Sequence, residues 1–241
     1  MAFNIQNSRP FIEFDFGINV QKGLVEDFSA VGQFGYNPSV STTFATVWGG
    51  TGLYVYPTTA TTVTATSSNT ASDNGGTILI SGLDASYNQQ SETITIGGSS
   101  STNTFIRVFS ARMLTATTGN ANVGNITITA DSKTVAYINA GYGSNLSAIY
   151  TVPANKRAWI VSASIGMSKQ KEIEAKILAK GINNGNVWNT VGYQTTFAVP
   201  LYRRFEIPIL IDQKHDIEMR AKADATSAVS ASFSIYLEDY H

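Results

Sequence analysis

The C-terminal stretch FEIPILIDQKHDIEMRAKADATSAVSASFSIYL, residues 205–237, decides the fold of this chain. Residues 229–237 alternate strictly between apolar and polar side chains, and residues 217–223 do the same. Successive side chains of a strand leave on opposite faces, so this period predicts two strands that each have one buried and one wet face. The small polar segment DATSA at 224–228 between them is typical of a hairpin connection. We therefore expect an antiparallel β-sandwich or jelly roll.

Strand patterns continue upstream of this stretch. Trp159, Val161, Ala163, Ile165 and Met167 alternate with Ile160, Ser162 and Ser164. Residues 171–180 are the one place where a helix competes, because Glu172 and Lys176 have the i,i+4 spacing of a helical ion pair. The same residues also alternate with period two and lie in a run of hairpins, so we predict a strand there.

Residues 48–132 are rich in Thr and Ser and form short alternating runs separated by turn signals such as Asn74-Gly75-Gly76. This spacing predicts a small β-sandwich unit. Residues 133–241 are predicted to form a second, jelly-roll-like sandwich. The expected fold class is thus all-β, with two β units and an extended N-terminal segment.

Residues 1–47 differ from the rest. Phe14, Phe16, Ile18 and Val20 alternate with polar or small residues, which predicts an extended segment. This segment is either a strand that completes the sandwich or an arm that reaches a neighbouring subunit by strand addition. Residues 28–47 are aromatic and glycine-rich without a clear period, and we expect a loop with short strands.

Composition excludes several classes of function. Charged residues make up 14% of the 241 residues and the net charge is −1, so the chain offers no general attraction to nucleic acid or to an anionic membrane. Without cysteine, thiolate zinc sites and cysteine nucleophiles are excluded. No apolar run approaches the ~20 residues that cross a bilayer, and the first residues do not resemble a secretory signal, so we expect folding in a cytoplasm.

The search for catalytic chemistry returns weak signals. His215 lies between two aspartates, but no second internal His or Cys completes a transition-metal site, and a solvated turn is favoured. No Gly-x-Ser-x-Gly elbow accompanies it. Acid pairs such as Glu13 and Asp15 cannot be placed across a cleft from sequence. We predict a protein without catalytic residues, metal or cofactor.

Two kinds of binding surface remain. Stacking on sugar would use exposed aromatic side chains, although large aromatics of an all-β protein usually belong to the core. The candidates for such stacking are Trp48, Tyr54, Tyr56, Tyr142, Trp188 and Tyr193. A protein interface is the preferred interpretation, because aromatic residues and arginine are enriched at interfaces. Its predicted residues are Phe3, Phe11, Phe14, Phe16, Arg203 and Arg204.

The order of these segments, from ISGLDASYNQQSETITIGG through IYTVPANKRAWIV to VSASFSIYLED, resembles uncharacterised virion structural proteins of tailed bacteriophages, especially those of aquatic bacteria. The resemblance covers about residues 48–239 and lies in the succession of strands and turns. It implies a component of the virion, assembled in the host cytoplasm, whose partners are sister copies and the major capsid protein or other virion proteins. A capsid decoration protein is the leading expectation. The alternatives are a neck or tail protein and a carbohydrate-binding module for the host surface.

Overall fold

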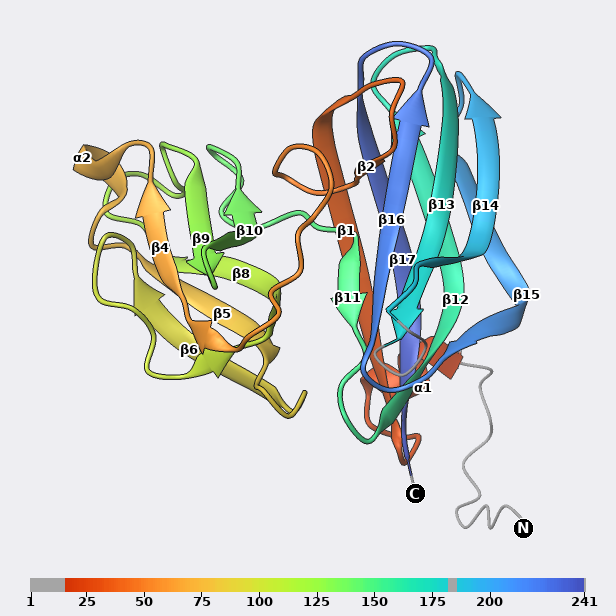
Figure 1. Cartoon of the computed structure of the whole chain (residues 1–241), viewed down its shortest axis with the longest axis horizontal. Helices are drawn as coiled ribbons and strands as arrows, with labels where there is room; N and C mark the ends of the chain where they lie inside the picture. The colour runs from red at the N-terminus through yellow and green to blue at the C-terminus, as the bar shows by residue number, and fades with distance from the viewer. Residues whose placement is uncertain (1–15, 182–185, 241) are drawn as a thin grey trace.

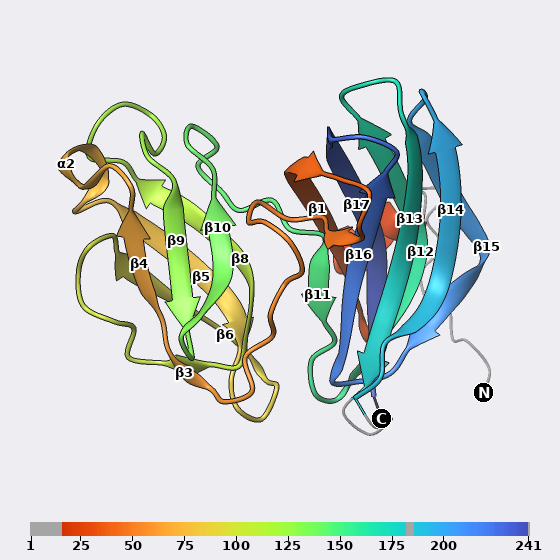
Figure 2. The same ribbon diagram turned by 45° about the horizontal axis from the view of Figure 1, so that its top comes forward.

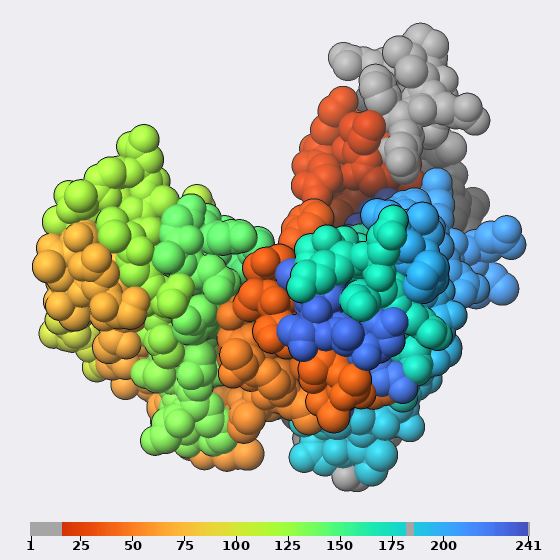
Figure 3. Space-filling model, turned by 90° about the horizontal axis from the view of Figure 1, so that it is seen from above, coloured from red at the N-terminus to blue at the C-terminus, as the bar shows by residue number. Residues whose placement is uncertain are grey.

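A computed structural model describes residues 16–181 and 186–240 of the chain. It confirms the all-β fold class: two β units stand side by side, and the paired strands in both units are antiparallel (Figure 1). Seen from above, the smaller unit lies beside the larger one (Figure 3). Among the described residues, no helix is both long and apolar enough to span a bilayer.

The larger unit consists of two packed sheets. Sheet A has the order β1-β17-β12-β15, and its strands are β1 (Phe28–Val40), β17 (Ser227–Asp239), β12 (Lys156–Met167) and β15 (Leu201–Ile211). Sheet B has the order β11-β16-β13-β14, and its strands are β11 (Ile149–Thr151), β16 (His215–Ala223), β13 (Glu172–Gly181) and β14 (Asn189–Phe197). The two-residue strand β2 (Ala45–Thr46) also pairs with β16.

The strand order of the larger unit is that of a jelly roll. β2 and β11 pair with consecutive stretches of β16, at residues 220–221 and 216–218, so they are two halves of one strand position. With this position counted once, sheet A has the chain order 1-8-3-6 and sheet B has the order 2-7-4-5. Strands that cross between two sheets in this way make the double Greek key of a jelly roll.

The smaller unit is inserted between the two halves of that second strand position. Its elements run from residue 61 to residue 138 and form facing sheets β10-β9-β4 and β6-β5-β8, with a short pair β3-β7 (Figure 2). The elements are β3 (Thr61–Thr62), β4 (Thr64–Ser67), α2 (Thr70–Asp73), β5 (Thr77–Leu83), β6 (Gln89–Thr95), β7 (Thr104–Phe105), β8 (Arg107–Thr115), β9 (Ile126–Ala130) and β10 (Lys133–Ile138).

Each unit has its own hydrophobic core. The inward faces of β16 and β17 contribute the apolar residues whose alternation predicted these strands, including Ile217, Met219, Phe233 and Ile235. A separate cluster around Ile78, Ile80, Ile126, Ile128 and Ile138 fills the smaller unit. Burial of these side chains, about 1.5–3 kcal/mol for each large aliphatic residue, is what holds each sandwich together.

Residues 171–180 form most of strand β13, so the prediction of a strand over a helix is confirmed. β13 is hydrogen-bonded to β14 on one side and to β16 on the other. These two ladders favour the strand over the helix that the spacing of Glu172 and Lys176 also allowed. Ile173, Ala175 and Ile177 all point into the core, which requires a period of two.

The prediction of an extended segment at residues 16–20 is wrong, because Phe16–Gln21 is the short helix α1. Phe16 packs against the rings of Phe28 and Tyr236, and Val20 is buried. A spacing of four residues suits one face of a helix as well as one face of a strand, and contact with sheet A decides between them. Phe14 lies outside the described residues.

Residues 28–40 form the long strand β1, not the predicted loop with short strands. β1 pairs with β17 along most of its length and so belongs to the larger sandwich. The period was hidden because Phe34 and Tyr36 occupy the outward face while Gly35 faces inward. At the other boundary, β10 at residues 133–138 pairs with β9, so these residues belong to the smaller unit and not to the C-terminal one.

Candidate functional site

The two connections to the inserted unit run together as a neck. Ala148 N donates a hydrogen bond of 2.9 Å to Val47 O, and Gly49 N donates one of 3.0 Å to Leu146 O. Gly35 of β1 lies directly under this neck. A Cβ atom at Gly35 would stand 2.1 Å from Val47 O, so only glycine allows the strand to approach so closely.

Arg107 of β8 ties the inserted unit to sheet B. Its Nε and Nη2 atoms donate hydrogen bonds of 2.7 and 2.9 Å to the two oxygens of Asp216, and both side chains are buried. Arg107 Nη1 also donates to Pro57 O at 2.8 Å. Thr151 Oγ1 donates to Asp216 at 2.7 Å, and Lys180 Nζ lies 3.5 Å from it. The guanidinium of Arg107 and the carboxylate of Asp216 therefore form a bidentate pair, and each group also has further hydrogen bonds.

Glu218 forms the second half of the junction. It was predicted to lie on the wet face of its strand, yet it is fully buried beneath the inserted unit. Tyr56 OH donates to Glu218 Oε2 at 3.1 Å, and Arg220 forms an ion pair with the same carboxylate. Burial raises the pKa of Glu218, while Arg220 and the Tyr56 hydrogen bond act in the opposite direction.

Aromatic rings pack around the charged groups of the junction. The ring of Trp188 lies 5.5 Å from the ring of Tyr56 and lies under Arg220 and Lys180, at 4.9 and 5.0 Å from its centroid. Burial also raises the pKa of Tyr56 and of Tyr54. The carboxylates of Asp216 and Glu218 are thus both paired with cations, and these contacts join the inserted unit to sheet B.

The predicted solvated turn at His215 is half-buried, with Nδ1 3.0 Å from Gln213 O. Over the residues that the structure describes, no group of three His, Cys, Asp or Glu side chains is arranged to hold a metal ion.

Four of the six aromatic residues proposed for sugar stacking are brought together, but they pack against one another at the junction and not on an open surface. Their ring centroids lie 5.1 Å apart for Trp48 and Tyr54, 4.7 Å for Tyr54 and Tyr56, and 5.5 Å for Tyr56 and Trp188. Trp48 and Tyr54 are buried, and Tyr56 and Trp188 belong to the junction. Tyr142 is exposed and stacks on Tyr36 at 6.0 Å. Tyr193 is exposed on β14, where its hydroxyl donates to Glu174 at 2.8 Å. The two exposed rings, Tyr142 and Tyr193, therefore lie apart from the cluster of the other four, and the six rings form no common exposed platform.

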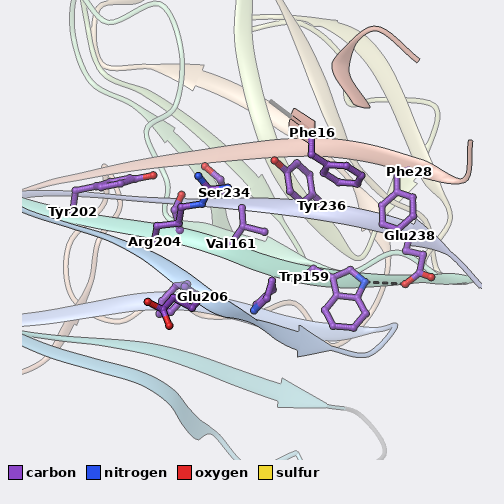
Figure 4. Close-up of a pocket in the computed structure, with 13 residues that line it drawn as sticks. Phe16, Phe28, Trp159, Val161, Tyr202, Arg204, Glu206, Ser234, Tyr236 and Glu238 are labelled. Atoms are coloured by element: carbon purple, nitrogen blue, oxygen red, sulfur yellow. Dashed lines mark hydrogen bonds between the residues drawn. The ribbon is translucent and has the colours of Figure 1, made fainter. Parts of the chain in front are cut away.

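A groove of about 1030 Å³ crosses the outward face of sheet A. Figure 4 shows that Phe16, Phe28, Tyr236 and Trp159 gather at one end of it. The ring of Phe16 stands edge-on to that of Tyr236, 5.0 Å away. Trp159 Nε1 donates a hydrogen bond of 2.8 Å to Glu238, which fixes the indole at this end.

The rest of the groove has a polar character. Ser234 of β17 and Ser162 of β12 contribute to its lining, because small side chains lie opposite each other on these two central strands. Tyr202, Arg204 and Glu206 of β15 line the other side (Figure 4). Within the described part of the chain, neither Arg204 nor Glu206 has an ion-pair or hydrogen-bond partner. Both charges are therefore available to a bound segment.

The predicted interface residues are only partly brought together. Phe16 and Arg204 both line the groove on sheet A. Arg203 points to the opposite side of β15, into a cavity of about 300 Å³ between the two sheets, and its guanidinium lies 5.6 Å from the Phe205 ring centroid. Adjacent residues of a strand point to opposite faces, so the arginine pair cannot act as one site. Phe3, Phe11 and Phe14 lie outside the described residues.

A strip of exposed apolar side chains follows the connection from β14 to β15. Phe197 is 66% exposed, Tyr202 is 67% exposed and Ile207 is 86% exposed, and Val199 between them is also exposed. We call these four residues the apolar rim. The sequence did not reveal the rim, because FEIPILI looks like a buried strand and the edge position of β15 depends on the sheet order.

Comparisons with known proteins add little to this geometry. No protein-family model and no curated protein sequence matches the chain. Among solved structures, that of the infectious bursal disease virus Gx strain aligns with 89% of this chain and 72% of its own chain, at 13% identity and a TM-score of 0.23. The structure of the Gt strain of that virus aligns over the same shares at 11% identity and a TM-score of 0.22. Likenesses this slight establish no relationship.

Proposed function

We propose that this chain is a non-enzymatic structural protein of a virion, which decorates the capsid as a homo-oligomer. The observation that carries the proposal is the apolar rim, Phe197, Val199, Tyr202 and Ile207, on the free edge of a jelly roll. Soluble monomers seldom expose large contiguous apolar patches, and such patches mark protein contacts.

The jelly-roll topology is compatible with this proposal. Jelly rolls occur in viral capsid domains and also in lectins and other proteins, so the topology alone does not choose among them. The resemblance of residues 48–239 to bacteriophage virion proteins favours the viral interpretation. The inserted unit is a second sandwich on the side of the larger unit away from β15, so the inserted unit does not cover the rim (Figure 1).

The mechanism would be burial of surface between copies. Full burial of a large apolar side chain contributes about 1.5–3 kcal/mol, so a rim of four such residues offers a useful part of the free energy of association. A stable interface buries about 800 Å² on each partner, which requires polar surroundings of the rim to join the contact. The net charge of −1 keeps repulsion between copies small.

The test is quantitative mass spectrometry of purified virions from the virus that encodes the chain. Hundreds of copies per particle would support a capsid decoration protein, whereas about a dozen would place the chain in the neck or tail. Absence from the virion would overturn the proposal. Turnover of a small molecule by the purified chain would contradict its non-enzymatic part.

The alternative is a carbohydrate-binding module. The observation in its favour is the groove on sheet A, where Trp159, Tyr202 and Tyr236 accompany Arg204 and Glu206, two charged side chains that have no partner among the described residues. A glycan array should be compared with the variant Tyr202→Ala, which removes an exposed ring. Trp188→Ala is unsuitable because Trp188 packs in the junction. Selective glycan binding that Tyr202→Ala abolishes would favour the module over the capsid protein.

A further inference from the structure

We propose that strand β15 joins two copies of this chain across a two-fold axis that passes at Phe205. The inference rests on the self-association part of the proposed function, and it states how two copies meet at the apolar rim. β15 is the last strand of sheet A in the order β1-β17-β12-β15, so among the described strands one side of it has no neighbour in this sheet. Figure 1 shows β15 at the outer edge of the larger unit, on the side away from the inserted unit.

The middle of β15 leaves the hydrogen-bonded ladder of sheet A. Ser162 is paired with Arg204 and Ile160 with Ile209, so residues 205–208 of β15 lie opposite the single residue Val161. Extra residues of this kind make a strand bulge away from its partner. Ile207 lies within this bulge and is 86% exposed. The bulge is therefore a part of the edge that a second copy can reach.

The side chains that β15 directs to the groove on sheet A form a row of alternating chemistry. We call Tyr202, Arg204, Glu206 and Pro208 the outward row, because all four line that groove. Arg204 and Glu206 are both exposed, and neither has an ion-pair or hydrogen-bond partner among the residues that the structure describes. The row thus presents one positive and one negative charge that are each open to a partner.

The outward row is complementary to itself when it is reversed. In a two-fold contact, residue i of one copy meets residue j of the other, and residue j meets residue i. With the axis at Phe205, Arg204 faces Glu206 of the partner subunit, and Glu206 faces the partner subunit's Arg204. Tyr202 faces Pro208 of the partner subunit in the same way, so that an aromatic ring packs against a proline ring.

The charges also select this register over its neighbours. An axis at position 204 would set Arg204 against the partner subunit's Arg204, and an axis at position 206 would set Glu206 against the partner subunit's Glu206. Like charges that face each other across an interface weaken it and suppress that arrangement. The axis at Phe205 is the one that makes both facing pairs attractive.

Side chains, and not a shared strand ladder, would make this contact. Pro208 has no N–H to donate, and the bulge interrupts regular pairing. Charges, proline and bulges on an edge strand also serve to prevent sheets from joining. However, Tyr202 and Ile207 expose large apolar surface at the same place, which a purely protective edge does not need. The rim would supply apolar burial, and the charge pairs would fix the orientation.

Charge reversal in the full-length chain tests the inference. Arg204→Glu and Glu206→Arg each place like charges opposite each other at both symmetric positions, so each should weaken self-association at least tenfold in sedimentation equilibrium. The double variant Arg204→Glu/Glu206→Arg exchanges the two charges and should associate within about threefold of wild type. The matched control is Arg112→Glu, the same change of charge at an exposed site of the inserted unit, which should have no effect. An unchanged Tm of each variant verifies that it remains folded.

Mixing the two single variants gives the sharpest measurement. In a mixed pair, the negative charges of the Arg204→Glu chain face the positive charges of the Glu206→Arg chain. The mixture should therefore associate at least as tightly as wild type, although neither variant does so alone. Native mass spectrometry with one chain isotopically labelled identifies the mixed dimer. Salt at about 1 M, where the Debye length is ~3 Å, should reduce the differences between variants.

Three results would each overturn the two-fold contact: single variants that associate like wild type, a double variant that does not recover, or a mixture that stays apart. These results leave the proposed function standing, because the rim could join copies in another orientation. A wild-type chain that remains monomeric would overturn both this contact and the homo-oligomeric part of the proposed function. Absence of the chain from virions would overturn the proposed function alone.

Discussion

Arg107 and Asp216, which are far apart in the sequence, form a buried bidentate ion pair with hydrogen bonds of 2.7 and 2.9 Å. Arg107→Ala should lower the free energy of unfolding by about 3–5 kcal/mol, because it leaves the Asp216 carboxylate buried without its main partner. Urea unfolding followed by circular dichroism measures this loss. Lys133→Ala breaks the more exposed pair with Asp131 and should cause no comparable change.

The double variant Arg107→Met/Asp216→Leu separates charge pairing from packing. If the large loss in Arg107→Ala comes from the unpaired carboxylate, the double variant should recover much of the stability. A double variant as unstable as Arg107→Ala would contradict this account of the junction.

Asp73→Asn should destabilise the smaller unit at neutral pH. It should also make the free energy of unfolding depend less on pH in the acid range. Burial acts to raise the pKa of Asp73, but hydrogen bonds from Ser67, Val123 N and Gly124 N outweigh it and lower the pKa below 3.8. The stability that this carboxylate contributes is therefore present above pH 3.8 and is lost as the pH falls through the folded-state value. Acid titration of both proteins by circular dichroism measures the difference, which should vanish at the lowest pH.

Glu218→Gln should behave in the opposite way. The folded-state pKa of Glu218 is raised above 4.5, so the folded protein holds this proton longer than the unfolded chain does. The wild-type protein then loses stability from this group as the pH rises from 4.5 through the raised value. The stability of Glu218→Gln relative to wild type should increase over that range. A difference that is constant with pH in chemical unfolding would show that the carboxyl group does not titrate as described.

Gly35→Ala should cost about 3 kcal/mol, because the added Cβ would meet the backbone of the neck at Val47 and Ala148. Gly32→Ala in the same strand is the matched control. A Cβ at Gly32 meets only the Phe34 side chain, at 3.3 Å, and that ring is exposed and can move. Thermal unfolding should show a much larger decrease in Tm for Gly35→Ala than for Gly32→Ala.

Ile207→Glu should weaken self-association at least tenfold while leaving the Tm nearly unchanged, because Ile207 is 86% exposed on the apolar rim. Sedimentation equilibrium measures the association constant. Leu114→Glu places the same charge at an exposed site of the inserted unit and should have no effect on association. Equal effects of the two changes would indicate that the rim is not the contact surface.

The sequence predicted the strands with one wet face, because the alternation in β16 and β17 directly reflects the core of the larger sandwich. It could not predict that β2 and β11 share one strand position, since two residues at 45–46 carry no period and their pairing with β16 is long-range. β1 was missed because aromatic residues and glycines mask its alternation. Strand order, and with it the exposed rim, depends on contacts that no local pattern records.

The candidate site shows the same division. Phe16 was predicted at an interface and lies in the groove, since an exposed aromatic segment is visible in the sequence. The junction was missed, although one signal was present in the sequence: Arg107 lies two residues from both Phe105 and Phe109, at the spacing of one strand face, where a charge needs a buried partner. Glu218 gave no signal, because its burial depends on an inserted unit that covers one face of β16.

The neck at Val47 and Ala148 brings the entry and exit of the inserted unit to within a single hydrogen bond of each other. Because these two ends are adjacent, the jelly roll can keep its strand order when the inserted unit is replaced by another domain or by a short loop. The inserted unit could thus be exchanged in evolution or in the laboratory, provided that Gly35 remains beneath the neck.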